Sequence, residues 1–240
     1  MRLLVTRPEP DARREAELLA ARGHQPVLAP LLDIEIINAP LPLAGAQALV
    51  VTSRNALRAL AAHPELGAAL KLPLFAVGEA TAGAARDLGF TDVTTGPGTA
   101  AELAALIARE VEPERGPLVH LAGETLAFDL EAALGARGFV IGKAVLYRAV
   151  PASGLPAQAL DLIAARRLDG VVLMSPRTTR TFAELVAKHG LVTQAKSLVC
   201  YCLSEAVAEA VAPLGCEVRV AARPREEDIL ALLDAETASS

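Results

Sequence analysis

The chain has few aromatic residues and no strong charge of either sign. Phe, Trp and Tyr make up 3% of its 240 residues, and there is no tryptophan. Proteins that bind nucleic acids by stacking bases need more aromatic side chains than this. The formal net charge is −5 at pH 7, so no overall field attracts DNA, RNA or anionic lipid. We therefore expect no nucleic-acid partner, and cations that bind an anionic ligand must be local.

Cysteine is scarce, and long hydrophobic runs are absent. Cys200, Cys202 and Cys216 form no CxxC motif and have no histidine at ligand spacing, which predicts reduced thiols and no metal site. No apolar run approaches the ~20 residues that span a bilayer. The N-terminal apolar run ends at Arg7 and Pro8, too early for a signal peptide. We therefore expect a cytoplasmic protein with no membrane partner.

What the chain does contain is a repeated unit of one short apolar run followed by an alanine-rich helical stretch. The first unit has a strand at Leu3–Val5 and a helix from about Pro10 to Ala21, ended by Gly23. The other predicted strands are Ala48–Val51, Leu74–Val77, Leu118–Leu121, Val171–Met174 and Leu198–Leu203. Strands that are apolar throughout predict parallel sheets covered on both faces. Their strand-to-helix loops then gather at the carboxyl edge of each sheet.

Two groups of segments repeat in order. Leu19–Gly23 matches Leu134–Gly138, 115 positions later, and Leu3 and Leu118 share that offset. Gly78-Glu79-Ala80 and Leu88-Gly89 match Ser204-Glu205-Ala206 and Leu214-Gly215, 126 positions later. The repeats indicate two similar halves that arose by duplication.

Two alternating, β-prone segments indicate how the halves are joined. They are Asp33–Asn38 and Ala144–Val150. If residues 34–38 and 144–150 pair as an antiparallel ladder, residues 39–143 form an inserted domain. Residues 1–33 and 151–240 then form a discontinuous domain. A thin connection of this kind would let the domains rotate and open a cleft.

Conventional catalytic signatures are absent from the sequence: it has no GxSxG, Walker or HExxH motif. The Gly96–Ala101 segment is typical of a turn in which Thr99 caps a helix at capping-box spacing from Glu102, although a capped helix start also binds anions. His120 lies within a predicted strand, which is more typical of a satisfied, semi-buried histidine than of a general base. No histidine-based mechanism is indicated.

The remaining candidates are small polar residues and arginines that directly follow strands. Each hydroxyl alone is typical of a helix N-cap, because free backbone N–H groups there need an acceptor. Together these loops offer N–H donors, positive helix ends and guanidinium groups to a ligand with several carboxylates or phosphates. The candidate binding residues are Thr6, Arg7, Thr52, Ser53, Gly78, Thr81, Thr99, Ser175, Arg177 and Ser204.

At these positions the sequence resembles the uroporphyrinogen-III synthase family. The matching stretches, in order, are LLVTRP, VVTSRNAL, FAVGEATA, GPGTAAEL, VHLAGE, ALGARGFVIGKAVLYRAV, VVLMSPRTTRTF and ARPREEDILALL. The resemblance implies two similar parallel-sheet, flavodoxin-like α/β domains joined by a two-stranded antiparallel β-ladder. It implies a hydro-lyase that closes hydroxymethylbilane, which has eight carboxylates, to uroporphyrinogen III with inversion of the last pyrrole ring. It implies no metal or organic cofactor, and we expect a monomer.

The resemblance also implies a mechanism that relies on positioning. Loss of the hydroxyl gives an azafulvene, and attack by the substituted carbon of the last ring gives a spiro intermediate. Tyr147 matches the family's tyrosine near the cleft, where its phenol would assist departure of the hydroxyl. Its alternative role is that of an amphipathic ladder residue with a solvated hydroxyl. Ser53, Thr81, Thr99 and Ser175 carry over as cleft contacts.

Two other functions are compatible with the same loops. One is a non-catalytic two-lobe module that binds a tetrapyrrole or another polyanion, because a fold alone does not fix function. The other is an α/β enzyme that acts on nucleotides or sugar phosphates. The absence of a glycine-rich phosphate loop argues against the second.

Overall fold

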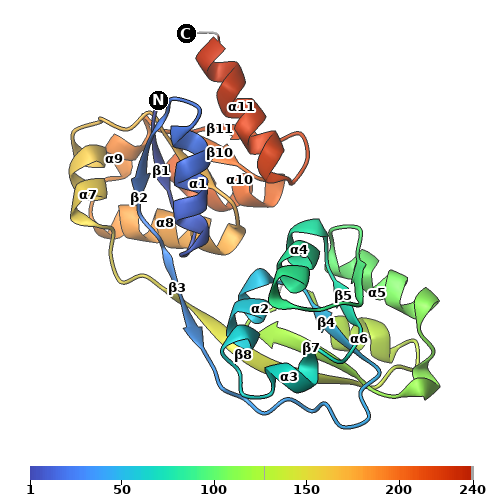
Figure 1. The fold of residues 1–240 in the computed structure, drawn as a ribbon. Helices are drawn as coiled ribbons and strands as arrows, with labels where there is room; N and C mark the ends of the chain where they lie inside the picture. Colours follow the sequence, from blue (N-terminus) through green and yellow to red (C-terminus); the bar gives the residue numbers. More distant parts are fainter. Residues whose placement is uncertain (127, 239–240) are drawn as a thin grey trace. The chain divides into compact units, whose positions relative to one another are not determined.

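The computed structural model describes residues 1–126 and 128–238 (Figure 1). The chain forms two compact units, each with its own sheet and core. Unit 1 comprises Met1–Asp33 and Val150–Ser240, and unit 2 comprises Ile34–Ala149. The predicted inserted segment 39–143 lies within unit 2.

Unit 1 contains a five-stranded sheet in the order β11-β10-β9-β1-β2, in which all neighbours are parallel. Its strands are β1 Arg2–Val5, β2 Gln25–Leu28, β9 Gly170–Leu173, β10 Val199–Cys202 and β11 Glu217–Val220. Its α-helices are α1 Asp11–Ala20, α7 Ala157–Ala164, α8 Pro176–Lys188, α9 Val192–Ala195, α10 Glu205–Val211 and α11 Glu226–Ala238. Helices α1 and α11 supply apolar residues to the core on one face of the sheet. Helices α7, α8, α9 and α10 supply the core on the other face.

Unit 2 contains a six-stranded sheet in the order β3-β8-β7-β4-β5-β6. Its strands are β3 Leu32–Ile36, β4 Ala48–Val51, β5 Leu74–Ala76, β6 Val93–Thr95, β7 Leu118–Gly123 and β8 Ile141–Pro151. Its α-helices are α2 Arg54–Ala61, α3 Leu66–Ala69, α4 Glu79–Leu88, α5 Ala100–Glu110 and α6 Leu130–Gly135. Helices α2, α3 and α4 pack on one face, and α5 and α6 on the other. Strands β4 to β8 pair in parallel.

Strand β3 pairs with β8 in the antiparallel direction. The Ile37 N–H donates to the Leu146 carbonyl at 2.7 Å, and the Ala152 N–H donates to the Leu31 carbonyl at 3.0 Å. Residue numbers therefore increase along β3 while the numbers of their partners decrease along β8, as in an antiparallel ladder. The predicted ladder is confirmed, with one difference. It is no isolated ribbon, because β8 also pairs with β7, so the ladder continues the edge of unit 2's sheet.

The sequence repeat corresponds to a repeat of the sheet. The offsets of 115 and 126 align β1 with β7 and β10 with β5. Written as β11-β10-β9-β1-β2 and β6-β5-β4-β7-β8, the two sheets place these strands at the same positions. The strand order of unit 1 is the 2-1-3-4-5 order of flavodoxin-like folds. Unit 2 has the same spatial order, but its equivalents of β1 and β2 come last in its segment, so the halves differ by a circular permutation.

The strands that the sequence did not predict lie at sheet edges. They are β2, β6 and β11, which are half-exposed. A central parallel strand is buried on both faces and has an uninterrupted apolar run, whereas an edge strand has solvent on one side. Sequences such as QPVL and EVRV therefore lack the signal on which the prediction depended.

Candidate functional site

Each sheet has a point at which the strand order reverses. In unit 1 the chain goes from β1 to β2 on one side and to β9 on the other. In unit 2, β4 lies between β5 and β7. Open α/β sheets bind ligands outside the carboxyl ends of their strands at such points. The ten predicted binding residues all lie in loops or first helical turns at these carboxyl edges, five in each unit.

In unit 2, the loop after β4 contains two half-buried hydroxyls. Ser53 is the N-cap of α2, and its Oγ accepts a hydrogen bond from the Asn55 N–H at 3.2 Å. The neighbouring Thr52 has its Oγ1 3.3 Å from Nε2 of His120, which lies on β7. The α2 N-terminus and both hydroxyls therefore lie at the reversal point of the sheet.

Two further helix N-termini meet next to it. Gly78 is the N-cap of α4, and a Cβ added there would lie 3.4 Å from the Gly98 Cα. A Cβ at Gly96 would lie 2.8 Å from the Ala76 carbonyl oxygen, so only glycine lets this turn approach the end of β5. Thr99 caps α5: its Oγ1 accepts from the Glu102 N–H at 3.2 Å and donates to the Glu102 carboxylate at 2.7 Å. The predicted N-cap at Thr99 is confirmed, and the Glu102 carboxylate contacts the Thr99 hydroxyl.

Tyr147 lies at the end of the same edge. It is half-buried on β8, in register with Gly123 at a bulge in the β7–β8 ladder. A Cβ on Gly123 would lie 2.6 Å from the Tyr147 Cζ, so the ring packs directly on the glycine backbone. In the part of the chain that the structure describes, no hydrogen bond to the Tyr147 hydroxyl is found. The phenol is therefore held in place by packing, while its hydroxyl keeps its hydrogen-bonding capacity.

In unit 1, Arg7 follows β1 and is surrounded by carboxylates. Its guanidinium lies 2.7 Å from the Glu226 carboxylate and 3.6 Å from that of Asp11. Glu15 is 2% exposed, and burial raises its pKa from 4.5 to about 7, partly offset by the positive charge of Arg7. Its Oε2 finds no hydrogen-bond partner among the described residues. Arg7 is thus already neutralised by the protein, which weakens it as a carrier of substrate charge.

The other loops of unit 1 contain hydroxyls at helix N-caps. Ser175 caps α8, and its Oγ accepts from the Thr178 N–H at 3.2 Å. Arg177 lies in the first turn of the same helix and is half-buried. Ser204 precedes α10 and makes no capping bond with its side chain. The loops after β9 and β10 therefore place one bonded and one unbonded hydroxyl at this edge.

Two predicted contacts have buried side chains. Thr6 is 0% exposed, and its hydroxyl donates to the Val172 carbonyl at 2.8 Å, across the β1–β9 pair. Thr81 is 6% exposed, in the first turn of α4. A side chain buried in this way supports the loop, so Thr6 and Thr81 are less suited than Ser53 or Thr99 to contact a ligand directly.

Three features of the candidate site were not predicted from the sequence. They are the Thr52–His120 contact, the Gly123 surface under Tyr147 and the carboxylates around Arg7. His120 is buried as expected, but its Nδ1 has no partner within the described residues, so it is only half satisfied. Among these features the sequence contained a signal for one, namely Gly123, the glycine that ends β7 opposite Tyr147.

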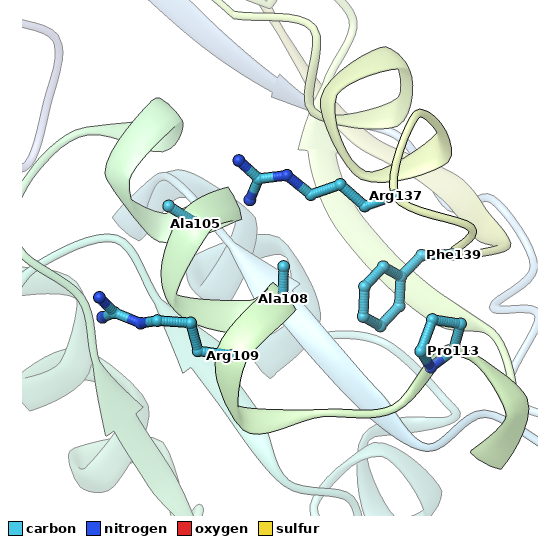
Figure 2. Close-up of a pocket in the computed structure, with 6 residues that line it drawn as sticks. All are labelled: Ala105, Ala108, Arg109, Pro113, Arg137 and Phe139. Atoms are coloured by element: carbon cyan, nitrogen blue, oxygen red, sulfur yellow. The ribbon is translucent and has the colours of Figure 1, made fainter.

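A pocket of about 480 Å³ lies elsewhere on unit 2 (Figure 2). It is lined by Ala105, Ala108, Arg109, Pro113, Arg137 and Phe139. Helix α5 begins at the carboxyl edge, after β6, and these α5 residues lie in its later turns. The pocket therefore lies toward the opposite, amino edge of the sheet. It includes none of the predicted site residues.

Comparisons with known proteins agree with this architecture. The sequence model of the family "Uroporphyrinogen-III synthase HemD" matches residues 13–231, which is most of the chain. The chain belongs to the uroporphyrinogen-III synthase family. It is therefore a cyclising lyase of tetrapyrrole biosynthesis, and the non-catalytic alternative is not favoured. A search of curated protein sequences found no match.

Solved uroporphyrinogen-III synthases have the same fold. The enzyme from Helicobacter pylori is 18% identical, with a TM-score of 0.66 and coverage of 98% of both chains. A mutant synthase from the extremely thermophilic bacterium Thermus thermophilus is 20% identical, with a TM-score of 0.59 and full coverage of both chains. The α/β fold class predicted from the sequence is thereby confirmed. Within the described ranges of this synthase, no helix has the length and apolarity to cross a membrane.

Proposed function

We propose that the chain converts hydroxymethylbilane into uroporphyrinogen III, with loss of water and inversion of the last pyrrole ring. Family membership supports the reaction. One observation in particular supports the location of the site. Tyr147 packs on Gly123 at the carboxyl edge of unit 2, and the N-termini of α2, α4 and α5 lie at the same edge. We also propose that the protein is cytoplasmic and monomeric.

The substrate's carboxylates require several donors rather than one strong cation. Helix N-termini offer unpaired backbone N–H groups and the positive end of the helix dipole. We assign carboxylate binding to the loops that contain Ser53, Gly78, Thr99, Ser175 and Ser204. Arg177 contributes from the first turn of α8. Because Arg7 is paired with Glu226, we assign it a smaller share of the binding energy than its position alone would suggest.

Tyr147 is the proposed catalytic residue. The phenol donates a proton to the hydroxyl of the bilane, which then leaves as water. Loss of water and of the adjacent pyrrole N–H proton gives the azafulvene, and the substituted carbon of the last ring attacks it to give the spiro intermediate. The bond from the spiro carbon to the original methylene bridge then breaks, and the azafulvene formed on the neighbouring ring bonds to the free α-carbon of the last ring. The hydrogen lost from that carbon balances the proton that the phenol donated. The protein otherwise acts by holding the chain in the folded geometry.

The isomer of the product tests this proposal. Hydroxymethylbilane supplied to the purified protein should give the type III isomer, measured by chromatography after oxidation. The type I isomer alone, at the rate without protein, would refute it.

Tyr147→Phe tests the assigned catalytic residue. Turnover should fall at least about fivefold, because the variant lacks the proposed proton donor. Stability should stay unchanged, because the hydroxyl makes no hydrogen bond within the described residues. Tyr201→Phe is the matched control, because this tyrosine is 1% exposed in unit 1's core. Within the described residues its hydroxyl donates only to the Met1 sulfur, at 3.6 Å. Unchanged turnover in Tyr147→Phe would remove Tyr147 from the chemistry.

A further inference from the structure

His120 is a buried titratable group that contacts a loop of the proposed site and takes no part in the proposed mechanism. It lies on β7, is 1% exposed, and is in register with Val50 of β4 and Lys143 of β8. Its Nε2 lies 3.3 Å from the Thr52 Oγ1. Its Nδ1 is buried and has no partner in the described part of the chain. One ring nitrogen therefore contacts a loop of the proposed site, and the other is buried without a hydrogen bond among the described residues.

The imidazole is neutral at neutral pH. Burial lowers the pKa of His120 to about 4, and the charges of Glu131 and Lys143 act on it in opposite directions. The Lys143 ammonium lies 3.5 Å from the Glu131 carboxylate, so these two charges largely offset each other. The residues of α5 that pack on this face are apolar. A neutral imidazole has one N–H, on either Nδ1 or Nε2.

The unpaired Nδ1 decides between the two tautomers. With the hydrogen on Nδ1, a buried N–H donor would have no acceptor, and an orphaned buried donor is rarer than an under-satisfied acceptor. With the hydrogen on Nε2, the ring donates to the Thr52 Oγ1 and leaves only a lone pair unpaired at Nδ1. The second tautomer is the less costly one. It also means that the Thr52 hydroxyl accepts from His120 and keeps its own hydrogen for another partner.

We propose that His120 is a positioning residue, whose Nε2–H donates to the Thr52 Oγ1 and directs the Thr52 O–H toward a substrate carboxylate. This inference rests on the proposed function, which places carboxylate binding at this edge. Thr52 is half-buried beside the N-cap Ser53, so a carboxylate there would also meet free N–H groups of α2. A freely rotating hydroxyl loses rotational entropy when it binds a carboxylate. The Thr52 hydroxyl, oriented in advance by His120, avoids this loss.

Amide variants of His120 test the direction of the hydrogen bond. The amide nitrogen of His120→Gln can replace the Nε2–H, whereas that of His120→Asn lies nearer to the Nδ1 position. We expect His120→Asn to raise KM about fivefold with a smaller change in kcat, and His120→Gln to stay within about twofold of the wild type. A KM in His120→Asn equal to that of His120→Gln would overturn the proposal.

A double-mutant cycle tests whether His120 acts through Thr52. Thr52→Val removes the hydroxyl with little change in volume, and should raise KM by at least the factor seen in His120→Asn. The double variant should show no further rise, because residues that act through one contact are non-additive. Additive effects, or an unchanged KM in Thr52→Val, would refute the coupling even if the type III isomer is still formed.

The tautomer can be measured without activity. Nitrogen-15 NMR of the histidine-labelled full-length protein at neutral pH should show hydrogen on Nε2 and none on Nδ1 of His120. Hydrogen on Nδ1 would overturn the proposal, even if the assay gives type III product. Failure to form type III product, with the Nε2 tautomer present, would instead refute the proposed function. The two failures are therefore distinguishable.

Discussion

The buried Glu15 predicts a specific dependence of stability on pH. It lies on α1, is 2% exposed, and has Arg7, Asp11 and Glu226 as its charged neighbours. Burial raises its pKa in the folded protein from 4.5 to about 7, with the Arg7 charge opposing the rise. The unfolded chain releases this proton near the ordinary value. Between these two pH values the folded state therefore binds more protons than the unfolded state.

The sign and the size follow from proton linkage. Stability from protonated Glu15 is fully present below pH 4.5 and is lost as the pH rises through about 7. At about 1.4 kcal/mol for each pH unit, the interval amounts to about 3 kcal/mol as an upper bound. Glu15→Gln has a similar shape and no titration. Its unfolding free energy relative to the wild type should therefore increase between pH 4.5 and 8, by up to that amount.

Urea unfolding of both proteins at half-unit intervals from pH 4.5 to 8 measures this difference. Glu17→Gln is the matched control, because Glu17 is exposed on the same helix, and its difference from the wild type should stay nearly constant. A Glu15→Gln difference that is flat with pH, or that decreases as pH rises, would refute the reasoning. The latter result would mean that Arg7 outweighs burial and that Glu15 is ionised in the folded protein.

Three further predictions concern unit 2. Gly123→Ala places a Cβ 2.6 Å from the Tyr147 Cζ. The variant should lower the free energy of unfolding by about 1–3 kcal/mol in urea, and it should also lower kcat. An unchanged kcat would show that catalysis does not depend on the position of the Tyr147 ring. Thr99→Ala removes the α5 cap and should cost about 1 kcal/mol, with Thr99→Ser as the control that keeps most of it. Arg109→Ala alters the pocket in Figure 2. It should leave KM within about twofold of the wild type, because the pocket contains no predicted site residue. A larger rise in KM would indicate that substrate binds in this pocket.

The sequence predicted the central strands of both sheets because burial on both faces imposes an unbroken apolar run. Ala48–Val51 was predicted with the bounds that β4 has, and Leu118–Leu121 lies within β7. The Asp33–Asn38 segment identified β3 through its alternation. The edge strands were missed, because half-exposed residues have no such pattern. The continuation of the ladder into unit 2's sheet depends on how β8 pairs with β7, which no local pattern records.

The site was predictable only to the level of the loop. The rule that carboxyl ends of parallel strands share one edge predicted that Ser53 and Thr99 lie at such an edge, and both lie at the carboxyl edge of unit 2. It could not tell an exposed hydroxyl from a buried one, such as that of Thr6. It also could not pair Arg7 with Glu226, because these residues are 219 positions apart. Such contacts depend on the final packing of distant segments.

The division of unit 1 into two chain segments has a consequence for synthesis on the ribosome. Strand β1 lies between β2 and β9, so one of its neighbours is made soon after it and the other only after unit 2. Strand β9 begins at Gly170, which at ~5–20 residues per second emerges roughly 10–30 s after β1. Unit 2 is one uninterrupted segment and can fold in that interval. We therefore expect unit 2 to fold before unit 1 can complete its sheet, although synthesis of unit 1 starts earlier.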